Sequence, residues 1–554
     1  MSRRRIAAAV FSLSLFAGAA AYAKKTIQVF QQQIPKQDRI DQALNRLTFG
    51  PRPGDAERVK AIGLKKWIDL QLHPSRIAEN PVLAEKLKTL DSLSMSSQEL
   101  VVNFPEPRMI REFRNGGLPV PVDPERTRML QKMAARFVQR QNGLAQDDDV
   151  LLNWEQLGAL RAGTPQQKLA AFEALPLETQ DDILVAYPQR LQALFPIAPP
   201  ELRRRLQLTA GPRQVVERDL AEGKLLRAIY SNRQLEEVLT DFWYNHFNVF
   251  IDKGADHYLV TAHERDVIRP HVLGKFRDLL EATAKSPAML FYLDNWESVA
   301  PNPQARAGAA PRRGLNENYG RELLELHTLG VDGGYSQKDV TEVARCFTGW
   351  SITRPQLGGG FNFNAKAHDQ GEKLVLGQKI HAGGIEDGEK VLDLLAHHPA
   401  TARFISRKLA MRFVADDPPA SLVDRMTQTF LKTDGDLRAV MKTMLESKEF
   451  WSVGAYRSKM KSPLELVASA VRAGNGDVDY ARSLAEQVAQ MGEPLYRKLE
   501  PTGYSNSSQE WMNSAGLLAR MNFALNLADN KVPGVKVETT AAGVSLGSPE
   551  FQKH

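Results

Sequence analysis

Apolar side chains recur at intervals of three and four residues along most of this chain. That spacing gathers them on one face of an α-helix, which can then pack against other helices. It is clearest in five segments, at residues 38–47, 55–72, 125–141, 166–174 and 214–230. Alternation typical of β-strands is scarce and is best developed at 358–376, where Phe361 and Phe363 alternate with asparagines. We therefore predict a mainly α, large multi-helical globular protein with a small β-hairpin-like excursion near 358–376.

The chain contains a single cysteine, Cys346. One cysteine cannot form a disulfide within the chain, so stability must come from a hydrophobic core. A chain of 554 residues is long enough to bury a large one. We predict that Cys346 is a small buried side chain in this core rather than a reactive thiol.

The first 23 residues have the features of an export signal. Three consecutive arginines from residue 3 precede an apolar run at 6–20, and residues 21–23 form a small-x-small cleavage site. The apolar run is too short for a stable membrane span, and no later segment approaches that length. We predict cleavage after Ala23 and a periplasmic or secreted product without an integral membrane segment. The sequence does not decide between the Sec and twin-arginine routes, and an uncleaved anchor or an ordinary first helix is the alternative.

Positive and negative side chains are interleaved along the sequence. The whole chain has a net charge of +7, and removing the three arginines of residues 1–23 leaves +4. A nucleic-acid surface needs clustered lysines and arginines with interleaved aromatic residues. The sequence has no such stripe, so nucleic acid is not expected as a partner.

Proline, glycine and charged residues divide the chain into five predicted parts. The first is the signal, and the last is an extended or mobile tail rich in glycine, valine, threonine and serine. Between them lie a helical lead-in, a proline-rich helical insertion or variable layer, and a helical core. The predicted boundaries are 1–23, 24–97, 98–209, 210–529 and 530–554.

The densest group of ionisable side chains lies in a predicted helix that Asn316 caps and Gly330 ends. A helical wheel places Arg321 one turn before Glu325, with which it can form an ion pair, and turns His327 toward leucines. This polar face is either a cavity wall, where Arg321 orients a carboxylate that acts as base or ligand, or a solvated surface. The catalytic candidates on it are Asn318, Arg321, Glu322 and Glu325.

A second predicted helix, in residues 231–250, places His246 in the middle of its apolar face. The purely structural interpretation of His246 is a core histidine with one satisfied hydrogen bond. If the apolar faces of the two helices meet, His246 and His327 form a buried pair whose lowered pKa suits a neutral metal ligand or a general base. We therefore add both histidines to the catalytic candidates.

His368 and Asp369 follow the predicted β excursion and are candidate metal ligands. A surface turn is the alternative interpretation of this pair. The sequence therefore leaves open whether the protein binds a divalent metal as a cofactor. The sequence contains no Gly-x-Ser-x-Gly elbow, no phosphate-binding Gly-rich loop and no His-Glu-x-x-His, which disfavours serine hydrolases, nucleotide-binding proteins and zincins.

Seven segments in a fixed order give the chain a family resemblance. It resembles the bacterial domain of unknown function family 1800. The resemblance implies a large, mostly helical exported protein without an accepted activity. Members of that family are discussed beside a second exported family with a phosphatase- or sulfatase-like fold, which implies a partner role. The matching segments are LNRLTFGPRPGD (44–55), DFWYNHF (241–247), RPHVLGKFRDLL (269–280), SPAMLFYLDN (286–295), NENYGRELLELHTLGVDGGYSQKDVTEVARCFTGW (316–350), HHPATARFISRKLAMRFVADDPP (397–419) and PTGYSNSSQEWMNSAGLLARMNFALN (501–526).

Three functional hypotheses follow. The first is an accessory or partner protein of the cell envelope that binds another exported protein. The second is a metal-assisted hydrolase or related enzyme that uses the histidines and carboxylates of the two helices. The third is an envelope polysaccharide binder with stacking platforms at Trp243, Tyr292, Trp296 and Trp350.

Overall fold

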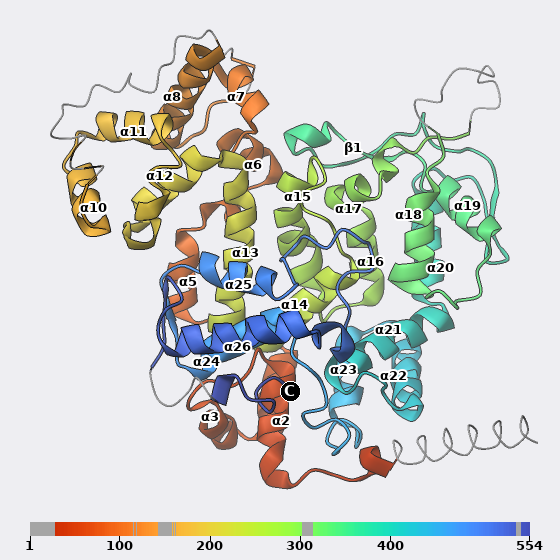
Figure 1. Cartoon of the computed structure of the whole chain (residues 1–554). Helices are drawn as coiled ribbons and strands as arrows, with labels where there is room; N and C mark the ends of the chain where they lie inside the picture. Colours follow the sequence, from red (N-terminus) through yellow and green to blue (C-terminus); the bar gives the residue numbers. More distant parts are fainter. Residues whose placement is uncertain are drawn as a thin grey trace, which may run out of the picture.

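The computed structural model describes residues 28–114, 116–117, 119–141, 158, 160, 162–301, 314–538 and 545–554. The predicted signal at 1–23 lies outside these residues. The described chain is mainly helical, which confirms the predicted fold class (Figure 1). Of the described helices, none combines the length and the apolar character that crossing a membrane requires.

The central helix α13 (Pro212–Tyr230) runs through the middle of the molecule (Figure 1). It packs against helices from both ends of the chain, which makes it the axis of the fold. Its direct neighbours include α5 (Pro81–Lys88), α12 (Pro200–Ala210), α14 (Gln234–His246), α15 (Asp256–Ala262), α24 (Pro463–Ala473) and α25 (Arg482–Gln490).

The remaining helices surround this centre in two groups. The N-terminal ones are α2 (Arg39–Leu47), α3 (Asp55–Ile62), α4 (Leu64–Leu72), α6 (Ser97–Asn103), α7 (Pro107–Arg114), α8 (Pro124–Gln141), α10 (Pro165–Glu173) and α11 (Leu177–Ala186). The later ones are α16 (Phe276–Ala284), α17 (Pro287–Tyr292), α18 (Glu317–Glu322), α19 (Gln337–Cys346), α20 (Glu386–Ala396), α21 (Pro399–Phe413), α22 (Ala420–Lys432), α23 (Leu437–Leu445) and α26 (Ser514–Ala528).

The β excursion consists of two short antiparallel hairpins rather than one. β1 (Trp350–Ile352) pairs with β2 (Phe361–Phe363), and β3 (Lys373–Val375) pairs with β4 (Gln378–Ile380). The predicted segment 358–376 therefore contains two strands, each of which finds its partner just outside that segment. A third pair, β5 (Asp477–Val478) with β6 (Val535–Lys536), joins the C-terminal part to the body.

Apolar side chains form one large core and a smaller second cluster. The large core runs from the first described helices to α26 and includes Cys346, whose burial raises the pKa of the thiol to about 12. This confirms the predicted buried cysteine. The second cluster lies mostly in residues 100–216, where α7, α8, α10 and α11 form the upper left of Figure 1. The predicted domain boundaries stay predictions.

The aromatic side chains proposed as sugar platforms belong to the core. Trp243 and Trp350 are fully buried, and Tyr292 is buried as well. Trp296 is half-buried and stacks on Phe291 with ring centroids 5.5 Å apart. Stacking on a sugar needs an exposed ring face. These four residues therefore do not form the predicted platforms.

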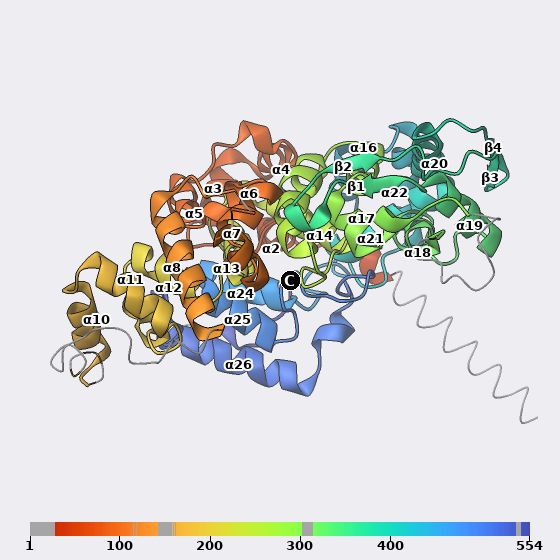
Figure 2. The same ribbon diagram turned by 90° about the horizontal axis from the view of Figure 1, so that it is seen from above.

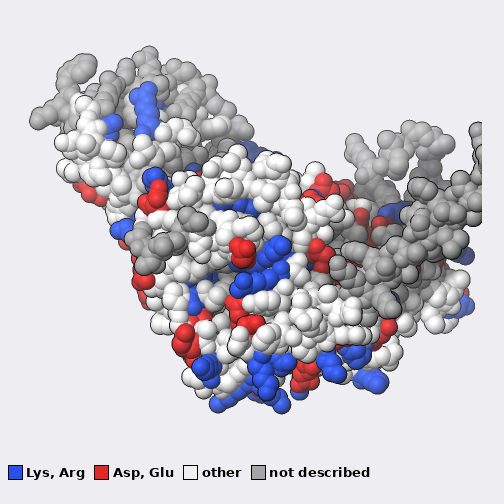
Figure 3. All heavy atoms as spheres, turned by 60° about the horizontal axis from the view of Figure 1, so that its bottom comes forward, with Lys and Arg blue, Asp and Glu red and all other residues white. Residues whose placement is uncertain are grey.

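Charged side chains of both signs are interspersed on the face shown in Figure 3.

The last described residues are hydrogen-bonded to the body of the protein. The backbone of His554 exchanges two hydrogen bonds with Lys459, at 2.9 and 3.2 Å. The last described residues, 545–554, are therefore anchored.

One loop lies tightly against α14. Asn245 donates from its side chain to the carbonyl of Tyr504 (2.7 Å) and accepts from the backbone N–H of Tyr504 (2.6 Å). Gly503, beside it, has φ +69°, and a Cβ there would lie 2.1 Å from the backbone oxygen of Asn245. The close approach of loop and helix therefore requires glycine at this position.

We predict that Gly503→Ala lowers the free energy of unfolding by several kcal/mol, because the new methyl group meets backbone atoms that cannot move aside. Gly492→Ala is the matched control. Gly492 also has a positive φ, of +101°, but a Cβ there meets nothing within 4 Å. Urea denaturation measures both variants. Equal losses of stability would show that backbone strain, not the contact with Asn245, makes glycine necessary.

Candidate functional site

The helix predicted from Asn316 begins and ends as expected. The Asn316 side chain accepts a hydrogen bond from the backbone N–H of Asn318 (2.8 Å), and Gly330 has φ +84°. However, α18 ends at Glu322, and the chain continues as a π-helical turn over Leu323–Thr328. A π-turn changes the angular position of every later side chain, because its hydrogen bonds join residues five apart.

This π-turn makes the predicted pairing of Arg321 with Glu325 wrong. Arg321 instead lies 3.7 Å from the carboxylate of Glu317 and donates to the side chain of Gln337 (3.0 Å). Glu325 accepts a hydrogen bond from the hydroxyl of Tyr335 (3.1 Å). Arg321 therefore does not orient either of the candidate carboxylates.

Among the predicted polar residues, Glu322 has a perturbed carboxyl group. Burial and the nearby charge of Glu325 raise the pKa of Glu322. Asn318 is exposed, and its side chain reaches only the carbonyl of Leu293, at 3.5 Å. Asn316 makes a shorter bond to the same carbonyl, at 2.9 Å. The two asparagines thus tie this helix to the end of α17, which is a structural role.

His246 and His327 do meet in the core, with ring centroids 6.2 Å apart, and both are buried. Nε2 of His246 donates to the backbone oxygen of His327 (3.1 Å), and Nδ1 accepts from Nζ of Lys408 (2.9 Å). Both ring nitrogens of His246 are therefore engaged. Burial and the charge of Lys408 hold the pKa of His246 well below its usual value, and burial lowers the pKa of His327 to about 3.

Lys408 is the chemically unusual member of this group. It comes from α21, and burial lowers the pKa of its ammonium group to about 8. A lysine with that pKa is partly neutral near neutral pH. Two buried histidines and a half-buried lysine therefore form a basic cluster in which only Lys408 titrates near neutrality.

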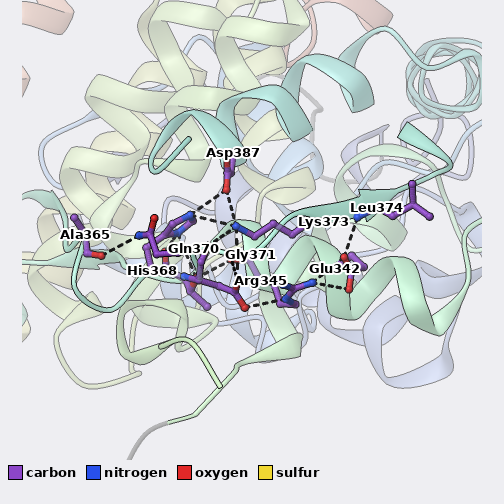
Figure 4. Close-up of polar contacts among 11 residues, drawn as sticks. Glu342, Arg345, Ala365, His368, Gln370, Gly371, Lys373, Leu374 and Asp387 are labelled. Atoms are coloured by element: carbon purple, nitrogen blue, oxygen red, sulfur yellow. Dashed lines mark hydrogen bonds and ion pairs between the residues drawn. The ribbon is translucent and has the colours of Figure 1, made fainter. Parts of the chain in front are cut away.

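His368 and Asp369, the predicted metal ligands, belong to one network of ion pairs. Figure 4 labels His368 and its neighbours Lys373 and Asp387. Nε2 of His368 lies 3.1 Å from Oδ2 of Asp387, and Nζ of Lys373 lies 2.6 Å from the same oxygen. Asp369 instead binds the guanidinium of Arg345 at 2.8 and 3.1 Å. The two predicted ligands thus point to different partners, and each carboxylate already has a cation. His368 lies in the interior, not on a surface turn.

A different group of described residues has the spacing for a metal ion. One carboxylate oxygen each of Glu217 and Asp252 and a ring nitrogen of His257 lie within 4.8 Å of one another. Arg497 reaches both carboxylates, at 2.6 Å from Glu217 and 3.0 Å from Asp252. The guanidinium of Arg497 therefore neutralises the carboxylates that a metal cation would need. None of the residues predicted as a site from the sequence belongs to this group.

A polar chamber of about 60 Å³ lies beside Asn245 and the loop that carries Gly503. That volume suits a few water-sized molecules rather than a large substrate. Its charged lining comes from α13, α14, α21, α24 and the chain around them, and consists of Lys224, Asp241, Arg412, Lys459, Glu465 and Glu493.

The chamber holds carboxyl groups with opposite pKa shifts. Burial, aided by Asp241, raises the pKa of Glu493 to about 8. Burial also disfavours the Glu465 carboxylate, but Arg412 at 2.5 Å outweighs it, and the pKa of Glu465 falls to about 2. A protonated and an ionised carboxyl group therefore coexist at neutral pH, which is an arrangement that can donate and accept protons.

Sequence reasoning missed most of this chamber. Asp241 and Asn245 lie in the recognised segment 241–247 and Arg412 lies in the recognised segment 397–419. The other four charged residues, Lys224, Lys459, Glu465 and Glu493, lie outside the recognised segments. No local spacing connects them. The available signal was that three recognised segments, 241–247, 397–419 and 501–526, all contribute side chains to the chamber lining.

We predict that Asp387→Asn lowers the free energy of unfolding by about 3 kcal/mol, because it leaves the buried charge of Lys373 without its closest counter-ion. The matched control is Glu372→Gln, which removes an exposed carboxylate that pairs with Lys379 and His381. We expect the control to unfold like the wild type in chemical denaturation. Similar curves for both variants would mean that the network adds no stability.

We predict that Glu493→Gln changes how stability depends on pH. The unfolded chain ionises Glu493 near 4.5 and the folded chain only near 8. Between these values the folded chain binds one more proton, so this group stabilises the fold fully below 4.5 and progressively less up to 8. Glutamine cannot ionise, and its oxygen can still accept the backbone hydrogen bond from Leu464.

The stability of the variant relative to the wild type should therefore rise as pH increases from 4.5 to 8. Urea titrations at several pH values measure this difference. Glu510→Gln, at an exposed position outside the chamber, is the control. A difference that stays constant with pH would contradict the raised pKa of Glu493.

Comparison with known proteins assigns the chain to a family. A model of the family described as "Protein of unknown function (DUF1800)" matches residues 42–552, which is nearly the whole chain. Neither the curated proteins nor the solved structures that were compared give a match. The family match includes the 316–330 helix, the buried histidines and the chamber. The chain therefore belongs to the DUF1800 family of proteins of unknown function.

Proposed function

We propose that this protein is an accessory protein of the bacterial cell envelope that binds another exported protein through helix α26. The observation that carries the proposal is an exposed row of large apolar side chains, which we call the α26 face. Their exposed fractions run from 38% to 62%. The row consists of Met512, Leu517, Leu518, Met521 and Leu525.

The α26 face carries no charge. All residues of α26 are described, and its single charged residue, Arg520, points inward and donates to the carbonyl of Lys461 (2.9 Å). The other exposed residues of the helix are Ser514, Ala515, Asn522 and Asn526. A helix that is apolar on nearly every side is normally buried. Here Phe523 and Leu527 face the core, so the outer half is the part that a partner would cover.

The chemistry of the α26 face favours a protein partner over a lipid surface. Cores of protein interfaces are depleted in charge and enriched in methionine and large apolar residues. Helices that lie on membranes instead carry lysine and arginine along their polar side. Figure 2 shows α26 along the outer margin of the molecule, where a partner can reach it.

A different protein fits this face better than a second copy does. Antiparallel packing of α26 on its own copy would bring Glu510 near Asp529 of the other chain, because these residues flank the two ends of the helix. Asp529 is already paired with Lys531 at 2.6 Å. The α26 face itself has no charged side chain that could orient a second copy, so we commit to a distinct exported protein with an apolar surface.

The structural roles of the predicted catalytic residues support a binding role as well. Asn318 helps to hold α17, and Arg321 pairs with Glu317. Both ring nitrogens of His246 are engaged in the core. These side chains build the body that presents the α26 face.

We predict that Leu518→Glu/Met521→Glu abolishes partner binding without unfolding the protein, since both side chains are exposed. A photoreactive residue at position 525 would first identify the protein that crosslinks in living cells. The purified partner should then bind the wild-type chain, and the double variant should weaken its affinity at least tenfold, because two charges would be buried unpaired.

The matched control is Val331→Glu/Leu431→Glu, at two exposed apolar residues outside α26. It should bind like the wild type. Equal affinity of the α26 variant would refute the proposal. Crosslinks only between copies of this chain would show that the α26 face binds a second copy. Binding to lipid vesicles that the double variant loses would show that it binds lipid. Either result would contradict the proposed protein partner.

A further inference from the structure

A groove of about 800 Å³ lies between α4, α23 and the start of α2. This volume is within the usual range of sites for small organic ligands. In Figure 2, α4 and α26 lie at opposite margins of the molecule. The groove is therefore separate from the α26 face, and a ligand in it is a question independent of the proposed function.

The floor of the groove is apolar and rigid. Leu72, Leu445 and Trp451 are buried at the edge of the core. Leu64 and Ile68 are half-buried and face the opening of the groove. Trp451 donates its indole N–H to the carbonyl of Leu445 (2.7 Å), which fixes the ring. The floor thus offers apolar contact and has already used its polar indole group.

The rim of the groove is basic, with Arg39, Lys65, Lys66 and Lys442. Within the described residues, Lys65 and Lys66 make no ion pair or hydrogen bond. The guanidinium of Arg39 lies 5.7 Å from the centroid of the Trp451 ring, and its Nε is buried without a hydrogen-bond partner. These three cations are left without a counter-charge.

The two acids of the rim do not neutralise these cations. Asp69 lies 3.4 Å from His73 and 3.6 Å from Arg76, both outside the groove lining. Glu446 lies 4.0 Å from Lys442. A ligand that brings negative charge to the rim therefore meets Arg39, Lys65 and Lys66 without displacing an existing ion pair.

We propose that this groove binds a free single-chain anionic amphiphile, with its alkyl chain along the apolar floor and its carboxylate or phosphate group against the unpaired cations of the rim. Burial of apolar chain surface supplies affinity, and the rim supplies selectivity for negative charge. The polar groups of the site are all at its edge, which matches a ligand whose polarity is confined to one end.

The same chemistry disfavours two other occupants. An extended peptide gains affinity from backbone hydrogen bonds with a strand edge, but helices supply most of this groove. Residues 1–23 of the chain carry three arginines and no acids, so their charge repels the basic rim. An amphiphile with a negative head is complementary to both floor and rim.

The test measures displacement of a fluorescent dansyl fatty acid from the purified full chain. The competitors are dodecanoate, dodecyl phosphate, dodecanol and dodecyltrimethylammonium, each below its micelle concentration. We expect the two anions to bind at least tenfold more tightly than the alcohol or the cation. Equal binding of all four would overturn the role of the rim, and failure of the probe to bind would overturn the site.

Two variants locate the ligand. Lys65→Glu/Lys66→Glu should weaken dodecanoate at least tenfold and leave dodecanol unchanged, whereas Ile68→Asp should weaken both. Lys338→Glu/Lys536→Glu, at exposed positions outside the groove lining, is the charge-matched control and should bind like the wild type. Unchanged dodecanoate affinity in the Lys65/Lys66 variant would refute the proposal.

Two further probes distinguish other sources of negative charge. If an acidic amphipathic peptide binds more tightly than dodecanoate, the ligand is a peptide. If the protein binds only to phosphatidylglycerol vesicles, the ligand is a lipid surface. Either result would contradict a free amphiphile as the ligand. Since these measurements involve neither α26 nor its partner, their failure leaves the α26 proposal untouched. Loss of partner binding in the α26 variant likewise says nothing about the groove.

Discussion

The buried charge of Lys224 is the interaction on which the centre of this structure depends. Its ammonium group lies 3.0 Å from Asp241 and 3.2 Å from Glu264, and the ring centroids of Tyr244 and Tyr496 lie 5.1 and 4.7 Å away. Burial disfavours the charged lysine, but the two carboxylates outweigh it and raise the pKa of Lys224. In a chain without disulfides, this contact joins α13, α14 and the loop of Tyr496, and an unpaired charge here would be very costly.

The two π-helical turns in the described part of the chain lie where charged or polar groups must face the interior. The turn at His263–Ile268 includes Glu264, which binds Lys224 and accepts a hydrogen bond from the hydroxyl of Tyr496 (2.6 Å). The turn at Leu323–Thr328 includes His327, whose backbone oxygen accepts the hydrogen bond from His246. A π-turn moves later side chains off the α-helical wheel and is frequent at functional sites. In this protein the first turn directs Glu264 toward Lys224, and the second places the backbone oxygen of His327 against His246.

The local sequence pattern was enough to predict the helices, the burial of His246 and His327, and the strand-forming segment. Each follows from the spacing of apolar residues within one element. The predicted pairing of Arg321 with Glu325 was wrong because a helical wheel assumes the same angle between all successive residues. Nothing in the amino-acid composition of this segment indicates the π-turn. The chamber could not be predicted either, since Lys224 and Glu493 are brought together only by the packing of distant elements. Which helices pack together is a tertiary property that periodicity does not encode.

The chamber and the α26 face share one loop, and this gives them a physical means of coupling. Trp511 lines the chamber, and Met512, the next residue, begins the exposed apolar row. Earlier in the loop, the backbone N–H of Ser508 donates to Asp416 (3.0 Å), and the carbonyl of Asn506 accepts from Lys459 (2.6 Å). A partner on α26 that restrains this loop would act on groups that touch the chamber charges. Coupling is reciprocal, so a partner that prefers one protonation state of the chamber must also shift its titration.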